Sequence, residues 1–106
     1  MQDREKKEKL VSFLDQKAFD PIISKSETDF PDDKKQMFRD VKRSTQSEKN
    51  RFHDQYKSAR EVKDTYLSDL RSKTAEKKNK ELQELNLPRL PDLQQDFIEL
   101  CDELHV

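Results

Sequence analysis

The fold is decided by residues 90–106, which read LPDLQQDFIELCDELHV and form the clearest amphipathic pattern in the chain. Apolar residues recur there at helical spacing and would form one stripe: Leu93, Phe97, Leu100, Cys101 and Leu104. Pro91 suits the first turn of a helix, where a missing N–H costs nothing. Because so short a helix is only marginally stable alone, it must bury its stripe against other segments. We therefore expect the rest of the chain to supply the helices on which it packs.

Composition favours helices over most other architectures. The 106 residues contain no glycine, which most readily adopts the positive φ angles of hairpins and phosphate-binding loops. Charged residues make up 42% of the chain and hydrophobic residues 30%, but the formal net charge is only −1. Disordered chains usually carry a high net charge, so an ordered chain with a thin core is favoured. We expect a single all-α domain over residues 1–106, with four or five helices in a mostly antiparallel bundle and no sheet.

Proline and polar connectors divide the chain into predicted helices. The first is expected from about Asp3 to Ala18, where Pro21 should stop it. Ile22 and Ile23 then form an apolar plug, with or without one more helical turn. Further helices are expected at about 31–55, 58–72 and 74–86, before a stiff linker over 87–91 and the C-terminal helix.

The breaks within the middle of the chain depend on capping residues. Residues 32–87 contain neither proline nor glycine, so one very long helix is an alternative. Ser58 and Glu61 have the spacing of a capping box, and Ser72 begins a second cluster of cap-forming residues. Asn86 is the best residue available for a left-handed C-cap. These signals favour two breaks, although the sequence leaves both arrangements open.

The predicted core joins the C-terminal stripe to apolar positions of the earlier helices. Its members are Leu10, Leu14, Phe38, Val41, Phe52, Tyr66, Leu70, Leu82, Leu93, Phe97, Leu100 and Leu104. If Phe97 or Leu100 were exposed, the C-terminal helix would instead be a surface for a partner.

Charge is distributed unevenly along the chain. Residues 34–80 carry 15 basic and 7 acidic side chains, a net charge of +8, whereas residues 81–106 carry 1 and 7, a net charge of −6. Five cations of the middle segment lie among aromatic residues, a mixture that can contact phosphates and stack on bases: Lys49, Arg51, Lys57, Arg60 and Lys63. A sequence pI of about 6.1 and the helical spacing of the aromatics favour a structural role over nucleic-acid binding.

An acidic row borders the C-terminal apolar stripe. It consists of Asp92, Asp96, Glu99 and Glu103. If the C-terminal helix packs on the middle of the chain, this row can lie over part of the basic segment 34–80. The row is thus a candidate docking surface, within the molecule or between copies, and exposed pairs of this kind select orientation more than they add stability.

Chemistry-bearing residues are few. Cys101 and His105 are four residues apart, but zinc sites usually need four ligands, and His53 is the only other histidine. A nucleophile, a base and an orienting group cannot be assembled from one cysteine and two histidines. A paired-carboxylate enzyme remains an alternative, although the carboxylates lie in charged rows. We predict no catalytic residue, no metal site and no cofactor.

The functional prediction follows by elimination. A single cysteine and the lack of a long apolar run predict a cytoplasmic protein without a membrane span. We expect a small non-enzymatic helical protein that acts through contacts with an unknown protein partner or a second copy of itself. The alternative is nucleic-acid binding through residues 34–80.

Overall fold

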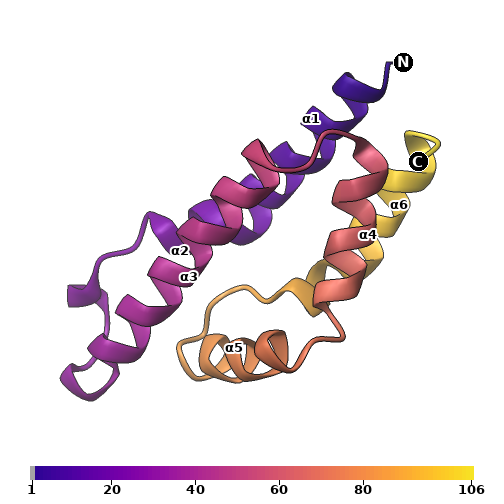
Figure 1. Ribbon diagram of the computed structural model, residues 1–106. Coiled ribbons are helices and arrows are strands. Elements are labelled where there is room, and N and C mark those ends of the chain that lie inside the picture. The colour runs from indigo at the N-terminus through magenta and orange to yellow at the C-terminus, as the bar shows by residue number, and fades with distance from the viewer. Residues whose placement is uncertain (1) are drawn as a thin grey trace.

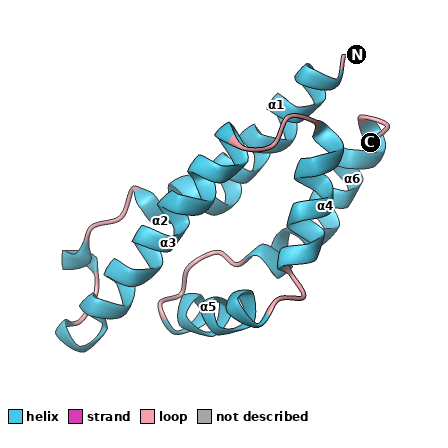
Figure 2. Ribbon diagram, viewed as in Figure 1, coloured by secondary structure: helices cyan, strands magenta, loops and turns pink. Residues whose placement is uncertain are grey.

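The structure, a computed structural model, describes residues 2–106, and every regular element in that range is helical (Figure 2). Its elements are α1 (Asp3–Leu14), a π-helical turn (Asp15–Phe19), α2 (Asp20–Ile23), short 3₁₀ turns at Glu27–Asp29 and Asp32–Lys34, α3 (Lys35–Asp54), α4 (Ala59–Asp69), α5 (Lys73–Glu84), a 3₁₀ turn at Leu90–Leu93 and α6 (Gln94–Glu103). Because α1, the π turn and α2 are continuous, residues 2–106 form five separate helices. The all-α class is therefore confirmed, with no strand among residues 2–106.

The helices form an elongated bundle of 47 × 22 × 20 Å. The continuous helix from α1 to α2 runs antiparallel to α3, and α4 and α6 are antiparallel to one another (Figure 1). α1 contacts both α4 and α6, and α5 lies against α3. The start of α1 and the end of α6 lie at the same end of the molecule, and α5 lies away from that end (Figure 1).

The predicted stop of the first helix at Pro21 is wrong. The backbone stays helical as far as Ile23. A π turn precedes the proline, and the N–H of Asp20 donates to the carbonyl of Asp15, five residues back. Pro21 follows this wider turn near the start of α2, so the helix continues through a residue that has no main-chain N–H to donate. The wider turn also keeps Phe19 and Ile22 buried on the inner side of the helix.

Capping explains where the middle helices begin and end. The Ser58 hydroxyl accepts the N–H of Glu61 at 3.1 Å at the start of α4, and the Ser72 hydroxyl accepts the N–H of Ala75 at 3.0 Å at the start of α5. Asn86 follows α5 with a φ of 56° in the left-handed region. Both predicted breaks are confirmed, and the alternative of one helix over 32–87 is wrong.

The buried side chains form two clusters. The larger joins α1 to α4 and α6, and the smaller joins Ile22 of α2 to α3, α5 and the start of the following linker. Among the predicted core residues, Leu70, Leu93 and Leu100 are only half-buried, and all the others are buried. Helical spacing therefore identified most of the core.

The C-terminal helix is an internal element of the bundle. Phe97 has no exposed area, and its ring centroid lies 4.1 Å from that of Tyr66 and 6.1 Å from that of Phe13. Tyr66 also donates a hydrogen bond from its hydroxyl to the carbonyl of Leu90, just before α6. These contacts hold α6 against α1 and α4.

Replacing Phe97 by alanine should cost about 3–5 kcal/mol of unfolding free energy, because a fully buried aromatic ring leaves a cavity in a thin core. Urea unfolding followed by circular dichroism measures the change. Ile98→Ala, a truncation at the half-buried neighbour on the same helix, should cost less. Equal losses for the two variants would contradict docking of α6 through Phe97.

Candidate functional site

A cleft of about 290 Å³ lies between α3 and α5, and we call it the α3–α5 cleft. Its apolar floor comes from the π turn, α2, α5 and the linker before α6: Ala18, Phe19, Ile22, Leu82, Pro88 and Leu90. Its polar groups include Thr45, Glu48, Arg51, Asp69, Lys78 and Asn79. α5 packs on α3 through Leu82 and Leu85, near its C-terminal end. Near its N-terminal end, Ala75 lines the cleft together with Phe19 of the π turn.

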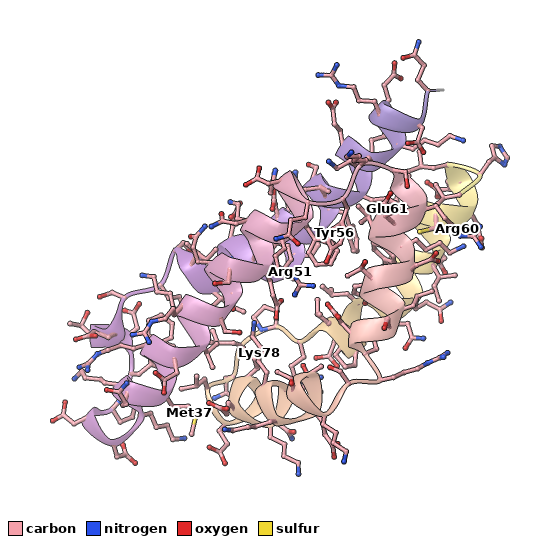
Figure 3. The ribbon with its side chains drawn as sticks, in the orientation of Figure 1. Met37, Arg51, Tyr56, Arg60, Glu61 and Lys78 are labelled. Atoms are coloured by element: carbon pink, nitrogen blue, oxygen red, sulfur yellow. The ribbon has the colours of Figure 1, made fainter. Side chains whose placement is uncertain are left out.

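An ion pair links the two walls of the cleft. Lys78 of α5 donates to a carboxylate oxygen of Glu48 of α3 at 2.8 Å, and their side chains are only 14% and 20% exposed. Figure 3 shows the Lys78 side chain extending from α5 toward α3. Since solvent screens such a pair less than an exposed one, it helps to fix the separation of the walls.

Asp69 is the carboxylate of the cleft that lacks a direct partner. It is half-buried, and the hydrogen bonds and ion pairs within residues 2–106 involve its main-chain carbonyl, which accepts from the Ser72 hydroxyl, but not its carboxylate. Burial raises the pKa of Asp69 above the usual aspartate value, and the charge of Glu48 also raises it, whereas the charges of Arg51 and Lys78 lower it. As the last residue of α4, it also lies where the helix dipole disfavours negative charge.

Arg51 stands at the edge of the cleft and is held by Tyr56. Its Nη2 donates to the Tyr56 hydroxyl at 2.7 Å, and its guanidinium carbon lies 6.0 Å from the centroid of that ring. Figure 3 shows both side chains on the side of α3 that faces α4 and the cleft. Arg51, one of the five cations singled out in the sequence, is therefore the one that belongs to the cleft.

The other four cations do not gather at one site. Lys49 pairs with Asp20 at 2.7 Å, and Lys63 donates to the main-chain oxygen of Val106 at 3.0 Å. Arg60 forms an exposed pair with Asp64 and points outward from α4 (Figure 3), and Lys57 is exposed. The hydrogen bond from Lys49 to Asp20 raises the pKa of Lys49.

Acidic residues of the N-terminal third neutralise much of the basic α3. Asp20 pairs with Lys49, and Glu27 pairs with Arg39 at 2.6 Å. The hydrogen bond from Arg39 lowers the pKa of Glu27, as expected for a carboxylate that accepts from a guanidinium. Asp15 of the π turn contacts the His53 ring at 2.8 Å.

The C-terminal acidic row makes none of the ion pairs that we predicted with residues 34–80. Within residues 2–106, Asp92 pairs instead with Arg89 at 3.0 Å, and Glu99 accepts from Gln95. The row is exposed because α6 turns its apolar side to α1 and α4. Two cations of the basic segment instead contact main-chain oxygens of residues 81–106: Lys63 donates to Val106, and Lys34 donates to Glu84.

The remaining candidates lie apart from the cleft. Cys101 is fully buried, and burial raises the pKa of its thiol, whereas His105 is exposed. Residues 2–106 hold no group of three or more histidine, cysteine, aspartate or glutamate side chains placed to share a metal ion. No helix in the same range is both long enough and apolar enough to cross a membrane.

Sequence reasoning missed the cleft because its lining residues are scattered from Ala18 to Leu90. Glu48, Asp69 and Lys78 each read as part of a solvated charged face. The helical spacing of Glu48 with Thr45 and Phe52, which are buried on α3, is a signal that could have indicated its position near the core.

Lys78→Met should lower the unfolding free energy by about 1–3 kcal/mol, because it leaves the mostly buried Glu48 carboxylate without its partner. Arg60→Met is the matched control, since it breaks an exposed pair with Asp64 and should cost only about 0–1 kcal/mol. Chemical unfolding of both variants measures the difference. Indistinguishable losses would mean that the pair does not hold α5 on α3.

Comparisons of the chain with protein-family models, with curated proteins and with solved structures found no match.

Proposed function

We propose that this protein is a non-enzymatic binding module that recognises a partner protein through the α3–α5 cleft. The observation that carries the proposal is an apolar floor surrounded by a few fixed polar groups, the arrangement of binding sites in general. At about 290 Å³ the cleft lies at the lower limit of small-molecule pockets. That volume suits an anchoring side chain of a partner, and such anchors carry most of the energy of many protein interfaces.

The chemistry of the cleft supports binding over catalysis. None of its lining residues is a histidine or a cysteine. Lys78 is engaged by Glu48, and Arg51 donates to Tyr56, so both cations already have partners within the fold. Asp69 alone has a carboxylate with a raised pKa there, and acid–base catalysis usually requires a second group within hydrogen-bond reach.

The walls of the cleft are preformed. α3 and α5 are joined by the smaller apolar cluster, which includes Phe38, Val41 and Leu82, and by the pair between Glu48 and Lys78. A rigid site loses less conformational entropy when a partner binds. The proposal thus needs no rearrangement of the helices.

Filling the cleft should weaken partner binding. A random-peptide library displayed on phage is selected on the immobilised protein, and selected peptides are titrated against ¹⁵N-labelled protein. Ala75 lines the cleft from α5, so Ala75→Trp should weaken binding by about tenfold or more. Lys77→Trp adds the same ring on the exposed side of α5, outside the cleft, and should leave binding unchanged.

Two results would contradict this function. One is a selection that yields no peptide whose binding shifts the resonances of cleft residues. The other is equal affinity of the selected peptides for the wild-type protein and for a folded Ala75→Trp variant.

Nucleic-acid binding through residues 34–80 is the alternative function, and the side-chain contacts give it less support. Lys49, Arg51 and Lys63 are each engaged within the molecule, and Arg60 is paired with Asp64. We expect no measurable affinity for duplex or single-stranded DNA or RNA even at low salt, where phosphate contacts are strongest. A salt titration by fluorescence anisotropy tests this, and affinity that falls steeply with added salt would favour the alternative.

A further inference from the structure

We propose that the α3–α5 cleft recognises a basic side chain of the partner protein, a lysine or an arginine, with its charged tip against Asp69. This inference rests on the proposed function, because it names the chemistry of the anchor that the cleft accepts. The aliphatic stem of that side chain would lie along the apolar floor formed by residues such as Phe19, Ile22 and Leu82.

The charges around the cleft single out Asp69. Of its four ionisable groups, Glu48 and Lys78 pair at 2.8 Å, and Arg51 donates to the uncharged Tyr56 hydroxyl and acts on Asp69 only through its charge. The hydrogen bonds and ion pairs of residues 2–106 leave the Asp69 carboxylate without a direct donor. A cationic tip would supply the donor, at a half-buried position where a charge-assisted hydrogen bond is stronger than in water.

Asp69 is placed where its charge works against the fold. It ends α4, where the helix dipole disfavours a negative charge, and burial penalises its ionised form. A neutral asparagine would occupy the same volume without either cost. Residues whose charge is unfavourable for the local structure are expected at functional sites, because partner binding there can offset the loss of stability.

The shape of the cleft narrows the choice of anchor. Lysine and arginine combine an apolar stem with a charged tip, which matches an apolar floor beside a carboxylate. An acidic side chain would place a second carboxylate beside that of Asp69, and a purely apolar one would bury the Asp69 carboxylate further without a partner. A basic anchor is the occupant that satisfies both features of the cleft.

The inference is tested on the peptides selected against the wild-type protein. They should share a lysine or arginine whose replacement by norleucine weakens binding by about tenfold or more. Asp69→Asn should cause a similar loss. Asp54→Asn is the matched control, because it removes the same charge from the last residue of α3, outside the cleft, and should leave affinity unchanged.

The unfolding stability of Asp69→Asn and the pH dependence of peptide affinity distinguish a loss of binding from a loss of folded structure. Because the pKa of Asp69 is raised on folding, its ionisation destabilises the protein as pH rises from the unfolded-state value through the folded-state value. Asp69→Asn should therefore be at least as stable as the wild type at neutral pH, although it binds less well. Affinity of the wild type should fall as Asp69 is protonated in acid, and that of Asp69→Asn should change less.

The outcomes distinguish this inference from the proposed function. Peptides that bind in the cleft without a common basic residue, or that bind equally to Asp69→Asn, would overturn the inference and leave the function standing. Equal losses of peptide affinity in Asp69→Asn and Asp54→Asn would also overturn it, since affinity would then depend on the total charge of the protein and not on Asp69. Failure to select any cleft-binding peptide would overturn the proposed function itself.

Discussion

The two apolar clusters are joined by the first helix and by α3, and the first helix reaches both clusters because it continues through Pro21. Its residues from Leu10 to Phe19 belong to the larger cluster, which includes Phe52 of α3 beside α4 and α6, whereas Ile22 belongs to the smaller cluster, which joins the first half of α3 to α5. If the helix ended before the proline, α5 would lose a surface on which it packs. The π turn therefore connects the two halves of a thin core, and its buried Phe19 also forms part of the cleft floor.

Charge pairing in this protein follows the packing rather than the charge totals of the sequence. The charge totals predict that the acidic C-terminal row pairs with the basic segment 34–80. Instead, α6 docks through its apolar side against α1 and α4. Acidic residues between Asp15 and Asp32 lie beside α3 instead, and several pair with its cations. Exposed pairs contribute only about 0–1 kcal/mol each, too little to turn a helix whose buried Phe97 contributes several times more.

The accuracy of the sequence predictions depended on the range of the interactions involved. Ser58, Ser72 and Asn86 act on their own helix ends, so local pattern was enough to divide the middle of the chain correctly. The predicted helix stop at Pro21 is wrong because the π turn before it depends on tertiary packing, which buries Phe19 and Ile22 on the two sides of the proline. The cleft was missed for a related reason, since Glu48 and Lys78 are 30 residues apart and only the packing of α5 on α3 brings them together.

A small core makes the position of Asp69 informative. In a large domain, one unfavourable carboxylate is easily tolerated, but a 106-residue chain with 30% hydrophobic residues has little stability in reserve. Burial and the end of α4 both act against its charge, yet Asn, Ser or Thr would close the same helix without that cost. Lys78 shows that this cleft can neutralise a carboxylate, because it does so for Glu48 at 2.8 Å. Asp69 is the carboxylate that the fold leaves for a cation from outside.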